Sequence, residues 1–189
     1  MTIYTLLLIA PLWILLNLAI NRHVSRRKKH HLTSLPLDAR FPFIPGFAIL
    51  YLSAYILGIL GLIIMLSHPD LNKVVWGYLF MVVTGSLFYL LFPSRVERHE
   101  NLTVTGLSTY LLALFQRISG PYNVFPSLHA AYCLFSALVV WHYFGLWPGL
   151  GLTVWTGLVS LGTLLTKQHY ILDIVSGIVL GLVVYMIFI

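Results

Sequence analysis

Six long apolar runs constrain this chain more than any other feature, because each is about as long as a helix that crosses a membrane. An α-helix rises about 1.5 Å per residue, so a hydrocarbon layer of about 30 Å needs roughly 20 apolar residues. The runs cover residues 2–21, 46–67, 74–92, 128–145, 148–165 and 169–189. We therefore expect an all-α fold, an integral membrane protein whose bundle of six transmembrane helices makes it multi-pass.

The composition agrees with this class, since 59% of the residues are hydrophobic and only 8% are charged. Such values are typical of membrane proteins rather than of soluble domains. No repeat, low-complexity tract or long linker divides the 189 residues. We predict a single membrane domain over residues 1–189, with its core at about 46–189. An N-terminal helix and a basic interfacial segment would occupy residues 1–45.

The net charge of +6 is concentrated in residues 22–29, which read RHVSRRKK. Beside a membrane span, such a run is a topology signal or contacts anionic headgroups, so the bilayer is the expected partner and nucleic acid is not. The acidic residues are only five: Asp38, Asp70, Glu97, Glu100 and Asp173. Magnesium-dependent phosphoryl transfer needs several carboxylates around the cation, so we expect no metal and no cofactor. The oligomeric state is left open by these features.

His169 and Asp173 form the most informative pair in the sequence, within TKQHYILD. Residues four apart share one face of a helix, so the carboxylate can orient the imidazole and leave one ring nitrogen free to attack. A carboxylate inside a spanning segment is costly unless it is paired, which makes it a candidate functional group. A purely structural pair is the alternative interpretation.

A second histidine, His129, follows Ser127 in the string FPSLHAAY. Ser127 is a suitable N-cap, and the free N–H groups at a helix N-terminus favour an anion. His129 would supply the proton that a leaving group needs in phosphoryl transfer. A capped helix with an incidental histidine would also explain this string.

Three cations complete a predicted phosphate-binding site: Arg95, Arg98 and Lys167. Arginine matches the geometry of phosphate with two parallel donors, and a lysine can neutralise phosphoryl oxygens. Because each predicted span reverses the direction of the chain, these cations and both histidines reach the same membrane face. Alone, the arginines could simply mark a loop near headgroups.

Two further segments have a predicted role in packing or access. Residues 107–118, LSTYLLALFQRI, are too few to span a membrane, so they form an interfacial helix, either a lid over the site or a packing helix. Gly177 and Gly181 form a GxxxG pattern, which predicts close packing of the last helix against a neighbour.

These motifs resemble those of the phosphatidic acid phosphatase type 2 superfamily, over roughly residues 36–185. Within it, the chain is similar to the branch of inositol-phosphoceramide and sphingomyelin synthases. FPSRVERH resembles the first motif, PSLH the second and KQHYILD the third, while LPLDARFPFIPGFAILY is similar to an interfacial segment of that branch. A third-motif arginine of the superfamily falls on Thr163, whose missing charge Lys167 would replace.

The resemblance implies a role for each candidate. His169 would be the nucleophile that forms a phosphohistidine, Asp173 its orienting partner and His129 the general acid. The phosphate would be held by Arg95, Arg98, Ser127 and Lys167.

Three functions remain open at this point. The first is a metal-independent phosphatase that hydrolyses a phosphorylated lipid. The second is a lipid phosphotransferase that moves a phospho-headgroup to a lipid or polyol acceptor. The third is a non-catalytic membrane protein. The absence of an obvious domain for a second substrate favours hydrolysis.

Two arguments give opposite predictions for the side of the membrane on which the site lies. Of the eleven Lys and Arg residues, all but Lys73 fall on the face of the candidate site when the spans are counted. The positive-inside rule then places this face in the cytoplasm. The family resemblance implies the outer or lumenal face instead.

Overall fold

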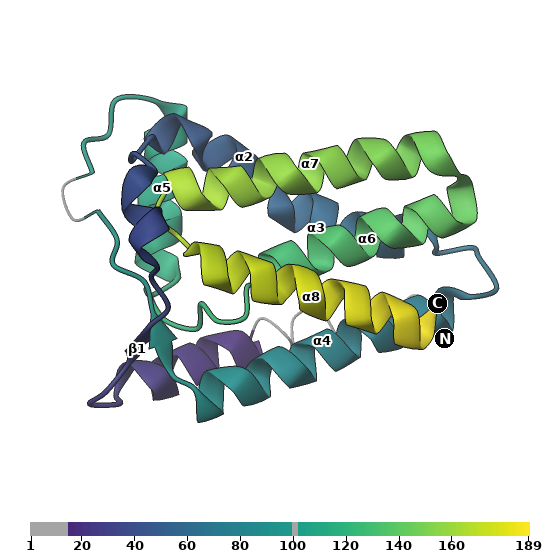
Figure 1. The fold of residues 1–189 in the computed structure, drawn as a ribbon, viewed down its shortest axis with the longest axis horizontal. Coiled ribbons are helices and arrows are strands. Elements are labelled where there is room, and N and C mark those ends of the chain that lie inside the picture. Colours follow the sequence, from purple (N-terminus) through teal and green to yellow (C-terminus); the bar gives the residue numbers. More distant parts are fainter. Residues whose placement is uncertain (1–14, 100–101) are drawn as a thin grey trace.

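The structure, a computed structural model, describes residues 15–99 and 102–189. Its main body is a bundle of apolar helices that run along one axis (Figure 1). These helices are α3 (Ala54–Ile64), α4 (Leu71–Leu91), α6 (Leu128–Phe144), α7 (Leu146–Leu165) and α8 (Ile171–Phe188). The short helices η2 (Pro45–Phe47) and α2 (Ala48–Leu52) lead directly into α3. The prediction of a helical fold is therefore confirmed.

Helix α6 lies at the centre of this bundle and packs against α3, α4, α7 and α8. Small residues let α8 approach it closely. A Cβ atom on Gly177 would overlap the carbonyl oxygen of Ser127, and one on Gly181 would lie 2.6 Å from the carbonyl oxygen of Ala131. The close packing predicted from the GxxxG pattern is thus present, and it holds the first turn of α6 against the middle of α8.

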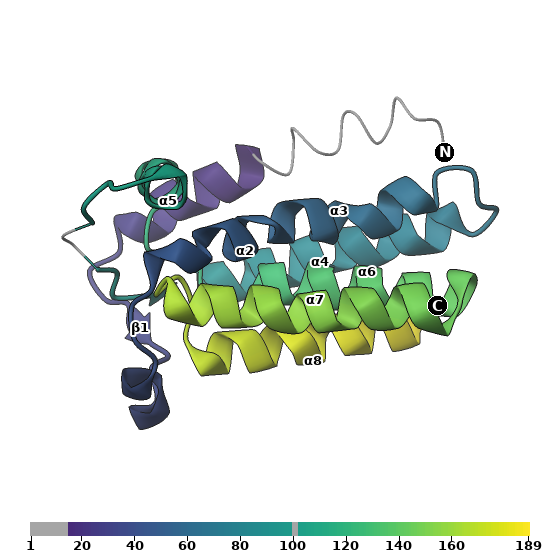
Figure 2. The ribbon, with the colours of Figure 1, turned by 90° about the horizontal axis from the view of Figure 1, so that it is seen from above.

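Helix α5 (Leu107–Ile118) has the predicted bounds and lies across one end of the bundle, where Figure 2 shows it end-on. It packs against η2 and α2. The hydroxyl of Ser108 donates hydrogen bonds to the carbonyls of Pro45 (2.8 Å) and Gly46 (2.9 Å). Its position at this end agrees with a short interfacial helix, while its role as a lid stays a prediction.

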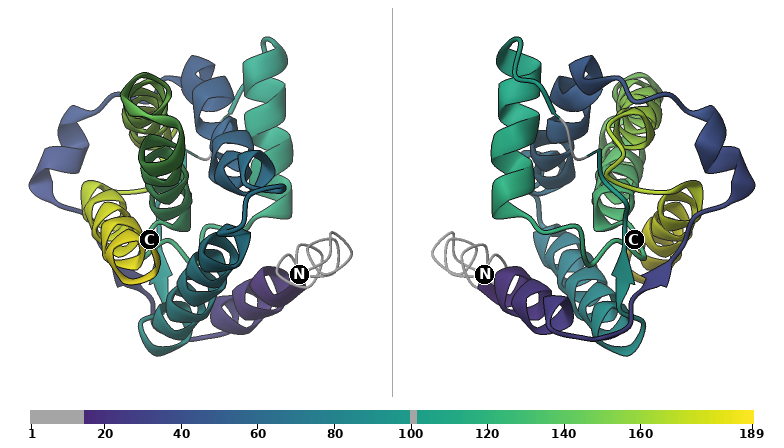
Figure 3. Two further views of the ribbon diagram at one scale, coloured as in Figure 1. Left: turned by 90° about the vertical axis from the view of Figure 1, so that its right-hand side faces the viewer. Right: turned by 90° about the vertical axis from the view of Figure 1, so that its left-hand side faces the viewer.

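The segment before the bundle runs over the same end. It contains β1 (His31–Leu32) and the 3-10 helix η1 (Pro36–Arg40). Strand β1 pairs in parallel with β2 (Ser94–Arg95), so this two-residue ladder is a small addition to the predicted all-α fold. Residues 15–25 form a helix that lies outside the bundle beside α4 (Figure 3). Ile20 and Val24 attach this helix to the core.

Within the described residues, four helices are long and apolar enough to cross a membrane: Pro45–Ile64, Leu71–Leu91, Leu146–Leu165 and Ile171–Phe188. They support a membrane protein and match four of the six predicted spans. Helix α6 is apolar but has only 17 residues, and residues 2–14 of the first predicted span lie outside the described residues. The count of six spans stays a prediction.

Candidate active site

The structure brings the two predicted histidines into direct contact at the end of the bundle that α5 crosses. Nδ1 of His129 lies 3.2 Å from Nε2 of His169, and the two ring centroids are 5.4 Å apart. His129 is the second residue of α6, and His169 lies in the turn between α7 and α8. Ring nitrogens from two motifs that are 40 residues apart therefore share one site.

Asp173 stands behind His169, but the two residues do not share one helix face, because His169 lies two residues before the start of α8. Asp173 belongs to the first turn of α8 and is completely buried. Its Oδ2 atom lies 3.6 Å from Nδ1 of His169, which is too long for a hydrogen bond, and Nδ1 has no other hydrogen-bond partner. The two groups are therefore neighbours without a hydrogen bond between them, and a small approach of the carboxylate would give Nδ1 its acceptor.

The Asp173 carboxylate receives its hydrogen bonds from other groups. Oδ1 accepts one from the Thr33 hydroxyl at 2.5 Å, and Oδ2 accepts one from the backbone N–H of Tyr170 at 2.8 Å. Thr33 is buried and directly follows β1. Thr33 is thus a site residue that the sequence analysis missed. No local signal marks it, because its partner lies 140 residues further along the chain.

Aromatic side chains surround His129 on its other side. The Tyr55 hydroxyl lies 3.1 Å from Nε2 of His129, so both ring nitrogens of this histidine have a polar neighbour. The ring of Tyr51 packs edge-on against His129, with centroids 5.4 Å apart. Phe115 of α5 contacts both tyrosine rings. Helix α5 therefore covers this side of the site through Phe115.

Ser127 caps α6, as predicted. Its Oγ atom accepts a hydrogen bond from the N–H of Ala130, and its own backbone N–H donates to the carbonyl of Asp173 at 2.9 Å. The side chain is completely buried two residues before His129. Ser127 therefore connects the start of α6, which carries His129, to the start of α8, which carries Asp173.

Two predicted phosphate-binding cations reach backbone carbonyls in the structure. Nζ of Lys167 donates to the carbonyls of Phe41 (2.6 Å) and Asp38 (3.1 Å), and so fastens η1 to the α7–α8 turn. Lys167 has a left-handed backbone with φ 53°, which is uncommon for a residue other than glycine. The Arg98 guanidinium donates to the carbonyls of Ser119 (2.5 Å) and Gly120 (2.9 Å), just past the end of α5.

The two arginines of the first motif differ in their surroundings. Arg98 is close enough to interact electrostatically with Tyr51 and Tyr55, the tyrosines beside His129, and burial lowers the pKa of its guanidinium. Arg95 is exposed on β2 and lines a separate surface pocket. The structure thus brings together His129, His169, Asp173 and Ser127, places Arg98 and Lys167 at the margin, and directs Arg95 elsewhere.

Buried acidic and polar groups hold the segment before the bundle onto this site. The Asp38 carboxylate accepts hydrogen bonds from the N–H groups of Leu35 (2.6 Å) and Ile171 (2.9 Å). Ile44 donates its N–H to the carbonyl of Leu165. These contacts explain why the interfacial segment can deliver Thr33 to Asp173. Among the described residues, no group of three or more His, Cys, Asp or Glu side chains could hold a metal ion.

Apolar helices that enclose a histidine pair and a buried carboxylate at one end define a helical membrane protein with a polar site at one face. A family model described as the PAP2 superfamily matches residues 29–187, which is well over half of the chain. The chain therefore belongs to the PAP2 superfamily, whose members are typically phosphatases or phosphotransferases. No curated protein and no solved structure gives a significant match.

Proposed function

We propose that this protein is a membrane phosphatase that hydrolyses a phosphorylated lipid through a phosphohistidine on His169, without a metal ion. The observation that carries the proposal is the 3.2 Å contact between the rings of His129 and His169, with the buried Asp173 behind His169. Membership of the PAP2 superfamily supports the reaction class. The small number of carboxylates supports chemistry without divalent cations.

The reaction would proceed in two displacements. Nε2 of His169 attacks phosphorus, the bond from phosphorus to the lipid oxygen breaks, and His129 gives its proton to that oxygen. Water then attacks the phosphohistidine, His129 takes back a proton, and inorganic phosphate leaves. Asp173 would stabilise the positive charge that His169 gains while its nitrogen is bonded to phosphorus.

The proposed mechanism requires a movement of the two rings. An in-line displacement places the attacking nitrogen and the leaving oxygen on opposite sides of phosphorus. The contact between His129 and His169 leaves no room for a phosphoryl group, so substrate binding must separate the rings. Ser127 would then offer its hydroxyl, and Arg98 and Lys167 would exchange a carbonyl partner for a phosphoryl oxygen. Arg95 would have to approach from the surface.

A phosphotransferase is the second candidate, because members of the PAP2 superfamily are typically phosphatases or phosphotransferases. A lipid alcohol or a polyol would then take the place of water in the second displacement. The first displacement would be unchanged.

The test uses purified protein in lipid nanodiscs and phosphatidate labelled with ³²P in its phosphate group. We expect a label on the protein that is stable to alkali, lost in acid and absent from His169→Ala. Free labelled phosphate indicates hydrolysis, whereas a new labelled phospholipid after addition of an alcohol acceptor indicates transfer. A label that persists in His169→Ala would refute the nucleophile, and loss of turnover with a chelator would refute the metal-free mechanism.

A further inference from the structure

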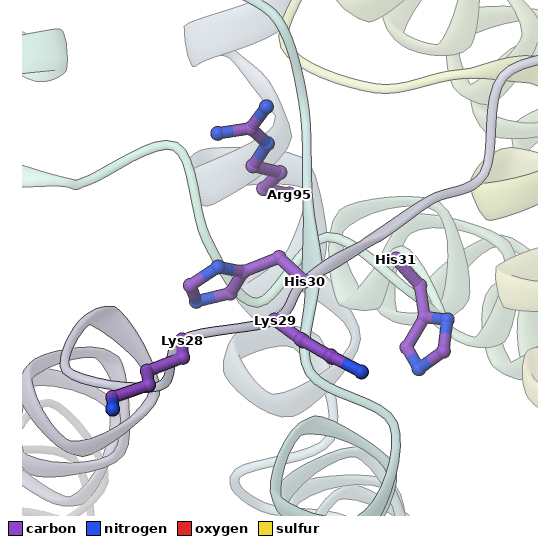
Figure 4. A pocket seen from close by; sticks show the side chains of 5 residues that line it. All are labelled: Lys28, Lys29, His30, His31 and Arg95. Atoms are coloured by element: carbon purple, nitrogen blue, oxygen red, sulfur yellow. The ribbon is translucent and has the colours of Figure 1, made fainter.

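A group of basic side chains lies at the same end of the bundle but does not include the histidine pair. It lines a surface pocket of about 400 Å³ and consists of Lys28, Lys29, His30, His31 and Arg95, which we call the basic patch (Figure 4). Lys28, Lys29 and Arg95 are exposed. Every residue in the patch carries or can carry a positive charge, so the patch attracts anions.

The short parallel ladder builds this patch. Strand β1 places His31 opposite Ser94 and Leu32 opposite Arg95, and the N–H of His31 donates to the carbonyl of Pro93 at 2.8 Å. This pairing fixes Arg95 beside the end of the basic run at residues 22–29. Like charges that are held together repel each other, and an anion bound between them removes that cost.

The patch contains no internal counter-charge. The ion pairs found in the described part of the chain are Lys73 with Asp70 and His169 with Asp173, and neither belongs to the patch. His30 is occupied through its Nε2 atom, which lies 2.9 Å from the carbonyl of Val24. The exposed lysines and Arg95 therefore keep their charge available for a ligand from outside.

An apolar groove of about 690 Å³ lies between the helix of residues 15–25 and the end of α5. Leu18 and Ala19 line it from the first helix, and Ile118 lines it from α5. Leu18 is 45% exposed and Ile118 is 63% exposed, so these apolar side chains face the surroundings of the protein. Arg22 and Ser25 stand further along the same helix and add polar groups to the lining.

Tyr122 joins the groove to the basic patch. It lines the groove, its ring lies 4.7 Å from the ring of His30, and its backbone forms a bridge with Arg95. A residue of the groove therefore contacts two residues of the basic patch, which makes the two hollows neighbours on the surface. Together they present phosphate-binding cations at one end and an apolar channel at the other, which is the chemical pattern of an anionic lipid.

We propose that the basic patch and the groove bind one anionic phospholipid, with its headgroup in the basic patch and one acyl chain along Leu18 and Ile118. The charge of the patch selects an anionic headgroup over a neutral one, since each Lys or Arg near a membrane surface attracts anionic lipid. The exposed apolar lining selects a lipid over free phosphate. The site does not use His129 or His169 and shares only Arg95 with the residues of the proposed phosphatase site, so lipid binding here can be measured in His169→Ala, which lacks the proposed nucleophile.

Photo-crosslinking locates the ligand. Protein in nanodiscs of neutral phosphatidylcholine is supplied with phosphatidylglycerol that carries a photoreactive group in one acyl chain, and crosslinked peptides are identified by mass spectrometry. We expect crosslinks within residues 15–31 or 118–122, also in His169→Ala. Crosslinks that are confined to other segments would overturn the proposal.

Substitutions then test the charges. We expect Lys29→Gln combined with Arg95→Gln to weaken phosphatidylglycerol binding, measured by native mass spectrometry, about tenfold or more. The matched control removes two charges outside the patch, Arg40→Gln with Lys73→Gln, and should change the affinity less than twofold. If both double variants weakened phosphatidylglycerol binding equally, the effect would come from the overall charge of the protein, and the proposed site would be refuted.

Competition experiments distinguish a lipid headgroup from free phosphate as the ligand of the basic patch. We expect unlabelled phosphatidylglycerol to displace the labelled lipid, while inorganic phosphate at the same concentration and neutral phosphatidylcholine both fail to do so. Displacement by inorganic phosphate would assign the patch to free phosphate and refute a lipid site. Displacement by phosphatidylcholine would show that the basic charges have no part in selection.

Discussion

Asp173 shows at the scale of single residues how a distant side chain completes the site. An unsatisfied carboxylate buried among apolar helices is strongly unfavourable. The Thr33 hydroxyl and the Tyr170 N–H satisfy its two oxygens and hold it beside His169. In the proposed mechanism, Thr33 would act on His169 through Asp173, which makes it a positioning residue rather than a catalytic one.

The first prediction concerns this hydrogen bond. Thr33→Val keeps the shape of the side chain but removes the hydroxyl, so Asp173 loses one donor and its hold on His169 weakens. A hydrogen bond to a charged group contributes about 1.5–3 kcal/mol, which corresponds to a roughly tenfold to hundredfold fall in kcat. The rate of phosphate release from a lipid phosphate measures this fall in kcat.

Thr33→Ser is the matched control, because it retains a hydroxyl and should keep most of the activity. Formation of the phosphohistidine in a single turnover distinguishes positioning from folding, since it should slow in Thr33→Val while the protein stays monodisperse. An unchanged single-turnover rate would show that this hydrogen bond does not serve the chemistry.

The sequence predicted which residues belong to the site better than it predicted which groups their side chains contact. His129, His169 and Asp173 were found because each stands in a short string of neighbouring residues, which is a local property of the sequence. Lys167 and Arg98 were selected for their charge, yet their ammonium and guanidinium groups reach the carbonyls of Phe41 and Ser119. Spacing along the chain carries no information on such long-range partners, and for the same reason it did not reveal Thr33.

At the scale of elements, hydropathy predicted the helices well because each helix must bury or expose its own apolar face. The predicted run 128–145 became α6 (Leu128–Phe144), and the predicted segment 107–118 became α5 (Leu107–Ile118) with the same bounds. Hydropathy could not predict the path of residues 31–44, because its place depends on hydrogen bonds that the Asp38 carboxylate accepts from the N–H groups of Leu35 and Ile171.

The second prediction concerns the contact of α6 with α8. Gly177→Ala places a methyl group against the carbonyl of Ser127, so the two helices must move apart. We expect a loss of about 1–3 kcal/mol in stability, as for other overpacked cores, together with lower activity, because Ser127 and Asp173 would shift. The chain's one cysteine, the buried Cys133, reports unfolding when a thiol-reactive dye reaches it during heating.

Gly157→Ala in α7 is the control, since a Cβ atom there meets nothing within 4 Å. Alanine favours a helix over glycine by about 1 kcal/mol, so this variant should be neutral or slightly more stable. Equal melting temperatures for Gly177→Ala and Gly157→Ala would contradict the close contact between α6 and α8.

At the scale of the whole molecule, the order of the helices separates the charges. The basic run, η1, β2, α5 and the α7–α8 turn all lie at one end of the bundle (Figure 1), while Lys73 begins α4 at the other end. Apart from Lys73, the other ten of the eleven Lys and Arg residues lie at the end of the bundle that carries the candidate site. This asymmetry favours a cytoplasmic site.

The third prediction tests that orientation. A membrane-impermeant thiol reagent should label Lys73→Cys in intact cells and His30→Cys only after the membrane is opened, because the basic end would face the cytoplasm. Cys133 is buried and gives no background. Labelling of His30→Cys in intact cells would place the site on the outer or lumenal face, as the family resemblance implies.

The bond between Thr33 and Asp173 also has a consequence for biosynthesis. A ribosome makes residue 33 long before residue 173, because 140 residues separate them. The pair can therefore form only after α3, α4, α6 and α7 have been made and α8 has begun. In the proposed mechanism, which needs His169 and Asp173 together, a nascent chain that stops before α8 would have no complete site.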